Sequence, residues 1–176
     1  MIAAPFVLTP PGYRDIGLDH WWLATSGKFD PIGASLADRH YSRRKPGSPQ
    51  FMPPGQTIVL IGHDMRSVFG WWRPHPDAGI TPMNGLDGWT CTIFRNEGRA
   101  LSSDLILDAE CAISALGHGC GPDGLLTYVG VREVESENPG YCFLCAGWRK
   151  RGWSADKRKR LLTKPALSAG ATGEAR

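Results

Sequence analysis

The chain has 176 residues, of which 41% are hydrophobic and 21% charged, and its formal net charge is +3. This length predicts one domain with a hydrophobic core, and no apolar run approaches the roughly 18 residues that a membrane span needs. The first fifteen residues, MIAAPFVLTPPGYRD, have no basic segment before their short apolar run. We therefore expect no signal peptide and a cytoplasmic location.

The N-terminal part of the chain is expected to hold two helices within irregular structure. Residues 1–14 are rich in proline and should form an irregular arm, whereas 16–25 suits a short helix. Asp30 is a good N-cap and Pro31 a good first helical residue, so a second helix is expected in the segment DPIGASLADRHYSRR. Prolines and glycines exclude regular structure from there to about residue 55.

The remaining elements follow from apolar runs and their periodicity. The most regular pattern lies in SSDLILDAECAISAL, where apolar residues recur at helical spacing after two serines that could cap the helix. Residues 74–88 should form a long loop, which in a compact domain is often functional. Strands are expected at 57–62, 67–73, 89–94, 125–131 and 160–163, and helices at 102–116 and 138–146.

This order predicts an α/β (α+β) fold with a mixed central sheet flanked by helices on both faces. Three consecutive strands suggest a meander. The strand–helix–strand unit after them implies a parallel pair with a crossover helix. We expect one domain over residues 1–164 and a disordered tail over 165–176, which is small and polar.

The cysteines do not suggest a disulfide framework, because their number is odd and the expected compartment is reducing. An alternative is a zinc site, since His118 and Cys120 form H-x-C and Cys142 and Cys145 form C-x-x-C. Buried free thiols are favoured over that site, and no metal is assigned. The five cysteines are Cys91, Cys111, Cys120, Cys142 and Cys145.

Positive charge is concentrated in two stretches, 39–45 and 149–160. Together they carry a net +10 against a total of +3, which leaves −7 for the rest of the chain. Such clustering predicts a surface that binds a polyanion such as DNA, although each stretch could also be a solvated face. The residues expected to contact nucleic acid are Arg39, Arg43, Arg44, Lys45, Arg149, Lys150, Arg151, Lys157 and Arg158.

The segment RNEGRALSS, 95–103, joins the strand at 89–94 to the helix that follows. A strand that runs directly into a helix leaves unsatisfied backbone N–H groups, which with the helix dipole favour a phosphate. Gly98 would allow close approach of a ligand, Ala100 is too small to block it, and Arg95 adds charge. Ser102 and Ser103 add hydroxyl groups, so the segment is a candidate pyrophosphate-binding loop, although a simple turn is also compatible with it.

Arg95, Gly98 and Ala100 fit the R-x-x-G-x-A form of the coenzyme A loop of GCN5-related N-acetyltransferases, which the chain resembles over about residues 57–163. The segment NPGYCFLCAGW resembles a second part of that family. The resemblance implies a GNAT-like sheet and acetyl-CoA or a related acyl donor. It places Asn96 with the loop, and Asn138 and Tyr141 along the coenzyme arm.

Four segments, RHYSRR, FMPPG, TIFRNEG…SS and NPGYCF…AGW, more narrowly resemble phage and prophage proteins related to Mom, the DNA-modification protein of bacteriophage Mu. That family has the acetyltransferase fold, modifies the exocyclic amine of adenine in DNA and uses a His-Tyr pair. Here the pair would be His40 and Tyr41. The resemblance implies a DNA base-modifying transferase in a phage-infected or lysogenic bacterium; a homodimer is compatible with it.

Transfer to an amine requires a base, and an acid can protonate the leaving thiolate. The candidates are His40, Tyr41, Glu97 and Tyr128, although His40 could instead serve a helix C-terminus and Tyr128 could be structural. A DNA base must leave its stack to reach such a site. Trp71, Trp72, Trp89 or Trp153 could stack on bases, with at least one of the first two expected in the core.

Two alternatives stay open from the sequence. The first is an ordinary N-acetyltransferase of a small amine or a protein, which would have an acidic acceptor pocket. The second is a non-catalytic DNA-binding protein that has kept the fold and lost the coenzyme. It would bind DNA in a salt-sensitive manner without being stabilised by acetyl-CoA.

Overall fold

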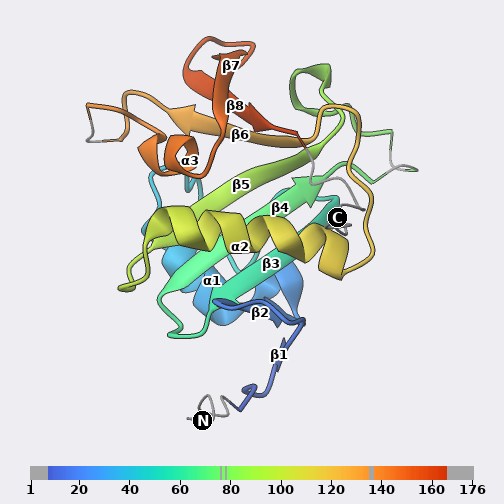
Figure 1. Ribbon diagram of the computed structural model, residues 1–176, viewed down its shortest axis with the longest axis vertical. Coiled ribbons are helices and arrows are strands. Elements are labelled where there is room, and N and C mark those ends of the chain that lie inside the picture. The colour runs from blue at the N-terminus through green and yellow to red at the C-terminus, as the bar shows by residue number, and fades with distance from the viewer. Residues whose placement is uncertain (1–7, 76, 78, 135–136, 166–176) are drawn as a thin grey trace, which may run out of the picture.

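The computed structural model describes residues 8–75, 77, 79–134 and 137–165, which form one eight-stranded mixed sheet and three α-helices (Figure 1). The helices are α1 (Pro31–Asp38), α2 (Ser102–Ala115) and α3 (Tyr141–Cys145), with short 3-10 turns at Gly27–Phe29 and Met83–Gly85. The strands are β1 (Tyr13–Arg14), β2 (Trp21–Ala24), β3 (Gln56–Gly62), β4 (Ser67–Arg73), β5 (Trp89–Asn96), β6 (Leu125–Gly130), β7 (Arg149–Trp153) and β8 (Lys159–Lys164).

The sheet has the strand order β1-β2-β3-β4-β5-β6-β8-β7. Strands β1 to β5 are antiparallel neighbours, and so are β6 with β8 and β8 with β7. The β5 and β6 strands are parallel, and α2 connects them. The expected meander and the expected crossover are therefore both confirmed.

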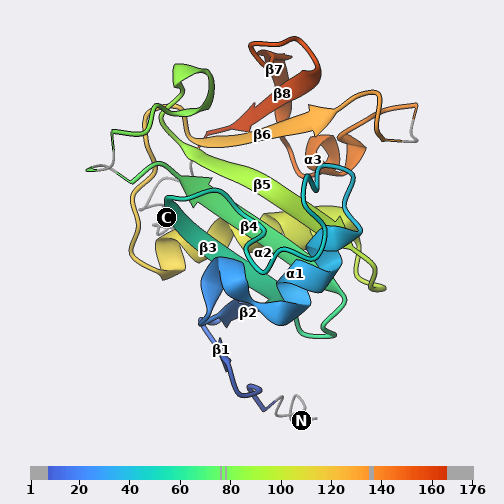
Figure 2. The same cartoon turned by 180° about the vertical axis from the view of Figure 1, so that it is seen from behind.

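Alternation along the central strands divides the core into two clusters. Leu60 and Phe69 belong to the cluster that contains the buried residues of α2 and α3, whereas Val59 and Val68 pack with α1. Successive residues of a strand point to opposite faces, so the two clusters lie on opposite sides of the sheet. Accordingly, α2 lies in front of the sheet in Figure 1 and α1 in front of it in Figure 2.

The helix expected at 16–25 is wrong, because this segment contains strand β2, which pairs with β3. Trp21 is fully buried, and its indole N–H donates to the Leu105 carbonyl of α2 at 2.9 Å. Trp22 points to the other face, where it stacks on His63 at 3.9 Å. Both faces of β2 are therefore covered, so its sequence lacks the alternation that identifies a half-exposed strand.

Strand β7 was not expected, because its sequence RKRGW is charged rather than apolar. It is the edge strand beside β8, and most of its side chains are exposed. An edge strand with charged residues needs no buried face, and its charges protect the open edge from pairing with another chain. The residues of the expected tail from 166 onward lie outside the described part of the chain.

Helix α1 begins at the N-cap that the sequence predicts, whereas helix α2 does not. At α1, the Asp30 carboxylate accepts from the Gly33 N–H at 2.7 Å, as a capping residue does. At α2, the expected serine cap is wrong, because the N-cap is Leu101 and no side chain caps the helix. The Ser102 hydroxyl instead accepts from the Asn96 amide at 3.1 Å.

Candidate functional site

The sheet opens between its two parallel strands. Pairing of β5 with β6 runs from Trp89 opposite Leu125 to Cys91 opposite Thr127, and no further pair follows within these described strands. Strand β5 nevertheless stays paired with β4 as far as Asn96. The register between β4 and β5 shifts at Thr92, which forms a β-bulge. The bulge therefore lies where β5 departs from β6.

A cavity lies on each side of this opening. The α1-side cavity has a volume of about 610 Å³, and its walls come from the end of α1, the segment 40–53 and the loop before β5. The α2-side cavity has a volume of about 500 Å³ and lies between the start of α2, the end of β6 and α3. Both cavities are lined by His40, Tyr41, Cys91, Thr92, Ile93 and Tyr128, so they meet at these residues.

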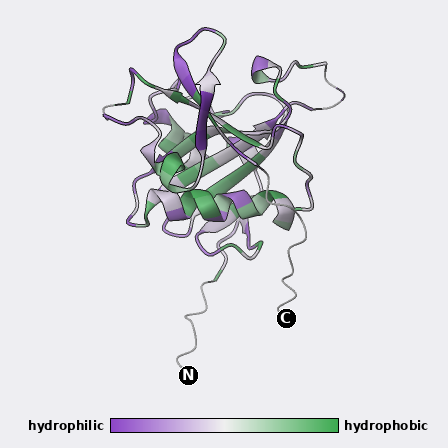
Figure 3. Ribbon diagram, turned by 45° about the horizontal axis from the view of Figure 1, so that its top comes forward, coloured by the Kyte–Doolittle hydropathy of each residue, from purple (hydrophilic) through white to green (hydrophobic). Residues whose placement is uncertain are grey.

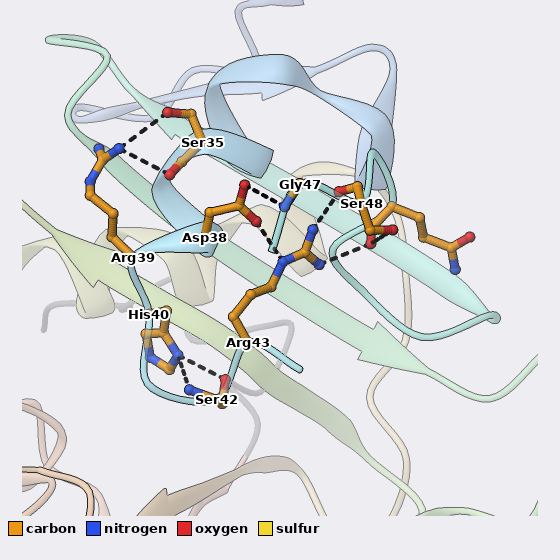
Figure 4. Close-up of polar contacts among 9 residues, drawn as sticks. Ser35, Asp38, Arg39, His40, Ser42, Arg43, Gly47 and Ser48 are labelled. Atoms are coloured by element: carbon orange, nitrogen blue, oxygen red, sulfur yellow. Dashed lines mark hydrogen bonds and ion pairs between the residues drawn. The ribbon is translucent and has the colours of Figure 1, made fainter. Parts of the chain in front are cut away.

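The segment after α1 places the expected His-Tyr pair at this junction. The His40 and Tyr41 rings lie 4.3 Å apart between centroids, and the Nδ1 atom of His40 is 2.8 Å from the Ser42 hydroxyl (Figure 4). The Tyr41 hydroxyl accepts from the Gly130 N–H at 3.1 Å, at the end of β6. A Cβ atom at Gly130 would lie 2.9 Å from the Tyr41 ring, so this contact requires glycine.

The surroundings set the protonation of both groups. Burial, and then the positive charges of Arg95 and Lys159, lower the pKa of His40 to about 4. Burial raises the pKa of the Tyr41 hydroxyl, against the Gly130 hydrogen bond, which lowers it. At neutral pH the junction therefore presents a neutral imidazole beside a protonated phenol.

The loop between β5 and α2 is held by its own side chains. The Asn96 amide donates to the Ala100 carbonyl at 2.8 Å, and its oxygen accepts from the Gly98 N–H at 2.9 Å. A Cβ atom at Gly98 would lie 2.2 Å from a carboxylate oxygen of Asp64, in the turn between β3 and β4. Gly98 therefore lies against the Asp64 carboxylate, a close contact within the protein, whereas the sequence suggested close approach of a ligand.

The start of α2 leaves a run of backbone donors free. Among the described residues, none accepts a hydrogen bond from the N–H groups of residues 99–103. Of the expected loop residues, Arg95, Asn96 and Ser102 line the α2-side cavity, Ala100 packs against the core, and Ser103 lies in the first turn of the helix. Unpaired amides at the N-terminus of a long helix can bind an anion.

Glu97 is bound by two arginines, which argues against its expected role as a base. The Arg39 guanidinium donates to both carboxylate oxygens, at 2.8 and 2.9 Å, and Arg95 donates to one of them at 2.6 Å. These hydrogen bonds lower the pKa of Glu97 to about 2. A carboxylate with this pKa is a poor proton acceptor at neutral pH. Since Arg95 also donates to the Arg39 carbonyl, the network ties the loop to the residue before His40.

The other expected catalytic and coenzyme residues lie around the same opening. Tyr128 is on β6, and its hydroxyl donates to the Met83 carbonyl at 3.5 Å. Asn138 precedes α3, and its carbonyl accepts from the Tyr141 N–H at 3.1 Å. The Tyr141 side chain is 61% exposed, and its neighbours Gly140 and Cys142 line the α2-side cavity.

Two of the four cations of the first basic stretch, Arg39 and Arg43, are engaged within the protein (Figure 4). Arg43 donates to the Asp38 carboxylate at 2.7 Å, to the Gln50 carbonyl at 2.9 Å and to the Ser48 carbonyl, and its side chain is 9% exposed. Arg39 holds Glu97 and the Ser35 carbonyl. The expectation that these two arginines contact DNA phosphates therefore has no support, whereas Arg44 and Lys45 are exposed and line the α1-side cavity.

Sequence reasoning missed several residues at the junction. Lys159 lines the α1-side cavity together with Met83 and Phe51, although these residues are far apart in the chain. Lys159 carried a signal, because it lies within the second basic stretch, and Phe51 begins the FMPPG segment of the family resemblance. Thr92 belongs to an apolar strand, and nothing in that run of residues identifies the bulge.

The prediction that tryptophan side chains stack on bases is wrong for three of the four candidates. Trp71 and Trp89 are at most 1% exposed and Trp72 is 4% exposed, so they cannot reach a nucleic acid. Their indole N–H groups donate to the Ala109, Gly119 and Pro54 carbonyls, respectively. Trp153 is 40% exposed and remains a candidate.

The cysteines and nearby acids form no metal site in the described part of the chain. Its five cysteines are free thiols, and only Cys91 is fully buried. No group of three or more His, Cys, Asp or Glu side chains is close enough to hold a metal ion within these residues. His118 instead stacks near Trp89 at 5.4 Å, so the described residues give the zinc alternative no support.

Comparison with known proteins identifies no relative. No protein-family model, curated protein or solved structure matches the chain. In the described residues, none of the helices combines the length and apolar character needed to cross a bilayer.

Proposed function

We propose that this chain is a Mom-like, GNAT-type transferase that moves an acyl or acyl-derived group to the exocyclic amine of a nucleobase in DNA, with adenine favoured. The observation that carries the proposal is the meeting of two cavities at His40 and Tyr41. An enzyme that joins two large substrates directly needs a separate approach for each and acid–base groups where they meet.

The α2-side cavity suits the acyl donor. The free N–H groups of residues 99–103 and the N-terminus of α2 would hold its phosphates. Arg95 and Ser102 line the same cavity, which continues to the junction between β5 and β6. A crossover helix beside parting parallel strands, with another helix on the opposite face, also supports the GNAT-like fold that the sequence resemblance implies.

The α1-side cavity suits a nucleotide as acceptor. Its lining contains Arg44, Lys45 and Lys159, together with Tyr41, Phe51 and Tyr128, and no Asp or Glu among the described residues. Cations favour phosphates, and aromatic rings favour bases. The same lining disfavours a cationic amine, which argues against the alternative of a small-amine acetyltransferase.

The chemistry follows from the protonation of the pair. A bound acyl thioester would supply the carbonyl at which the lone pair of the amine forms the new N–C bond as the C–S bond breaks. Neutral His40 would take the proton of the attacking nitrogen, which becomes strongly acidic as its lone pair is donated, so that even a base with a pKa of about 4 can accept it. The Tyr41 O–H would give a proton to the leaving sulfur. Because the Tyr41 oxygen accepts from Gly130, its own proton remains free to be donated.

The test is mass spectrometry of nucleosides from plasmid DNA of cells that express the wild type, His40→Ala or Tyr41→Phe. A heavier nucleoside that the wild type produces and both variants lose would support the proposal, and its mass would identify the added group. An unchanged wild-type profile would contradict base modification. Thermal shift with acetyl-CoA would then separate a small-amine transferase, which is stabilised, from a DNA-binding protein that has lost the coenzyme.

A further inference from the structure

The β7–β8 hairpin carries a dense and largely unpaired positive charge. It includes most of the second basic stretch, 149–160, and stands out from the sheet as a hydrophilic projection at the top of Figure 3. Its one acid, Asp156, accepts from the Ser154 hydroxyl and the Arg158 N–H, and no lysine or arginine side chain of the described residues forms a salt bridge with it. The exposed cations are Arg149, Lys150, Arg151, Lys157 and Arg158.

This hairpin also holds the exposed tryptophan. The chain has seven tryptophans. Trp153 is 40% exposed, whereas the other six are buried in the core and at most 4% exposed. The Arg160 guanidinium lies over its ring at 3.8 Å from the centroid. This contact orients the indole, and Trp153 remains 40% exposed beside it.

The hairpin is connected to the α1-side cavity by the contacts of one loop, that of Asn84. The Asn84 amide donates to the Trp153 carbonyl at 3.2 Å, and its oxygen accepts from the Ala155 N–H at 3.0 Å. The adjacent Met83 lines the cavity, as does Lys159 from the hairpin itself. The indole and the cavity are therefore neighbouring parts of one basic surface.

We propose that the β7–β8 hairpin binds single-stranded DNA next to the modified nucleotide, with a base stacked on Trp153 and the phosphates on the exposed lysines and arginines. An ordered aromatic ring among cations is the combination that binds single strands without reading their sequence. In a duplex the faces of the bases are already stacked on one another, so the indole favours an unpaired strand. Only the position of the target nucleotide rests on the proposed function.

Fluorescence anisotropy with a labelled 16-nucleotide DNA, single-stranded or annealed to its complement, tests this proposal. Trp153→Ala should weaken single-strand binding about tenfold and duplex binding less than twofold. Trp153→Phe should keep most of the affinity, since it keeps an aromatic face. Phe29→Ala is the matched control, because Phe29 is 53% exposed beside Lys28, another cation–aromatic pair, and should change nothing.

Equal losses on both DNA forms, an unaffected Trp153→Ala or an equal effect of Phe29→Ala would overturn the proposal, as would a wild type that binds no single strand. Vesicles that contain anionic lipid provide a further arm. Trp153-dependent binding to vesicles without a preference for single-stranded DNA would identify a membrane surface instead. The result is independent of nucleoside modification, so either proposal can fail while the other stands.

Discussion

The two basic stretches look alike in the sequence and serve different purposes in the structure. In the first, 39–45, Arg39 and Arg43 are bound to carboxylates and carbonyls that position the His40–Tyr41 pair. In the second, 149–160, most cations are exposed on a hairpin at the edge of the sheet. A cation is therefore available to a ligand only where no carboxylate or carbonyl of the fold binds it.

The largest expected effect concerns Arg43. Replacement by alanine removes the contact with Asp38 and leaves two carbonyls without their donor, so the free energy of unfolding should fall by about 2–3 kcal/mol. Arg44→Ala is the matched control, since Arg44 is exposed, and should change it by less than about 0.5 kcal/mol. Urea unfolding measures both. Equal effects would show that the two arginines are not used differently.

The next effect is the pH dependence of stability that His40 causes. Its pKa is about 4 in the folded protein and near the ordinary 6.5 in the unfolded chain, so the unfolded state takes up a proton first. The stability that neutral His40 contributes is present above pH 6.5 and is lost as the pH falls toward 4. Relative to His40→Gln, the wild type should lose about 1–3 kcal/mol across this window. If the free energies of unfolding of the two proteins, measured with urea, fell in parallel with pH, the burial of a neutral imidazole would be contradicted.

A smaller effect is expected for Glu97. Its folded pKa of about 2 lies below its ordinary value, so its stabilisation is present above about pH 4.5 and is lost as the pH falls toward 2. Solvent screens this carboxylate, which limits the cost of Glu97→Gln near neutral pH to less than about 1 kcal/mol. Thermal unfolding from pH 6 to pH 3 should show the difference from the wild type shrinking. A constant difference would mean that ionisation of Glu97 does not stabilise the fold.

The smallest effect on stability should come from the hairpin. Arg158→Gln should leave the unfolding midpoint nearly unchanged, because the exposed Arg158 side chain makes no hydrogen bond with the described residues and its backbone N–H keeps the bond to Asp156. The same variant should reduce the slope of log K against log salt by about 0.7 for single-stranded DNA. Anisotropy titrations at several salt concentrations measure the slope. A destabilised protein with an unaltered slope would assign Arg158 to the fold instead of the ligand.

The sequence predicted the centre of the fold better than its edges. Strands β3, β4 and β5 and helix α2 follow from their apolar patterns, because one buried face leaves a clear period. The pattern around strand β2 predicts a helix, because Trp21 and Trp22 are buried on opposite faces of the strand and leave no alternation. The sequence of strand β7 contains no apolar pattern, because most of its side chains are exposed at the edge of the sheet.

At the site, the sequence and its family resemblance suggested that His40 and Tyr41 act with the loop at Arg95, and these residues line one cavity. The partners of Glu97 and Arg43 could not be predicted. Glu97 and Arg39 are 58 positions apart, and the pairing depends on how the end of α1 meets the end of β5. The contact of Gly98 could not be predicted either, since the Asp64 carboxylate that lies against it belongs to a turn distant in the sequence.

Photo-crosslinking tests the central claim most directly, because it locates the nucleic acid on the protein. A DNA strand that contains 4-thiothymidine would be irradiated with the wild type, and the crosslinked peptides would be identified by mass spectrometry. We predict crosslinks at the α1-side cavity, around Tyr41 and Phe51, and at Trp153 on the hairpin. Crosslinks confined to α2 and α3, with none at these residues, would contradict the assignment of the α1-side cavity to the acceptor.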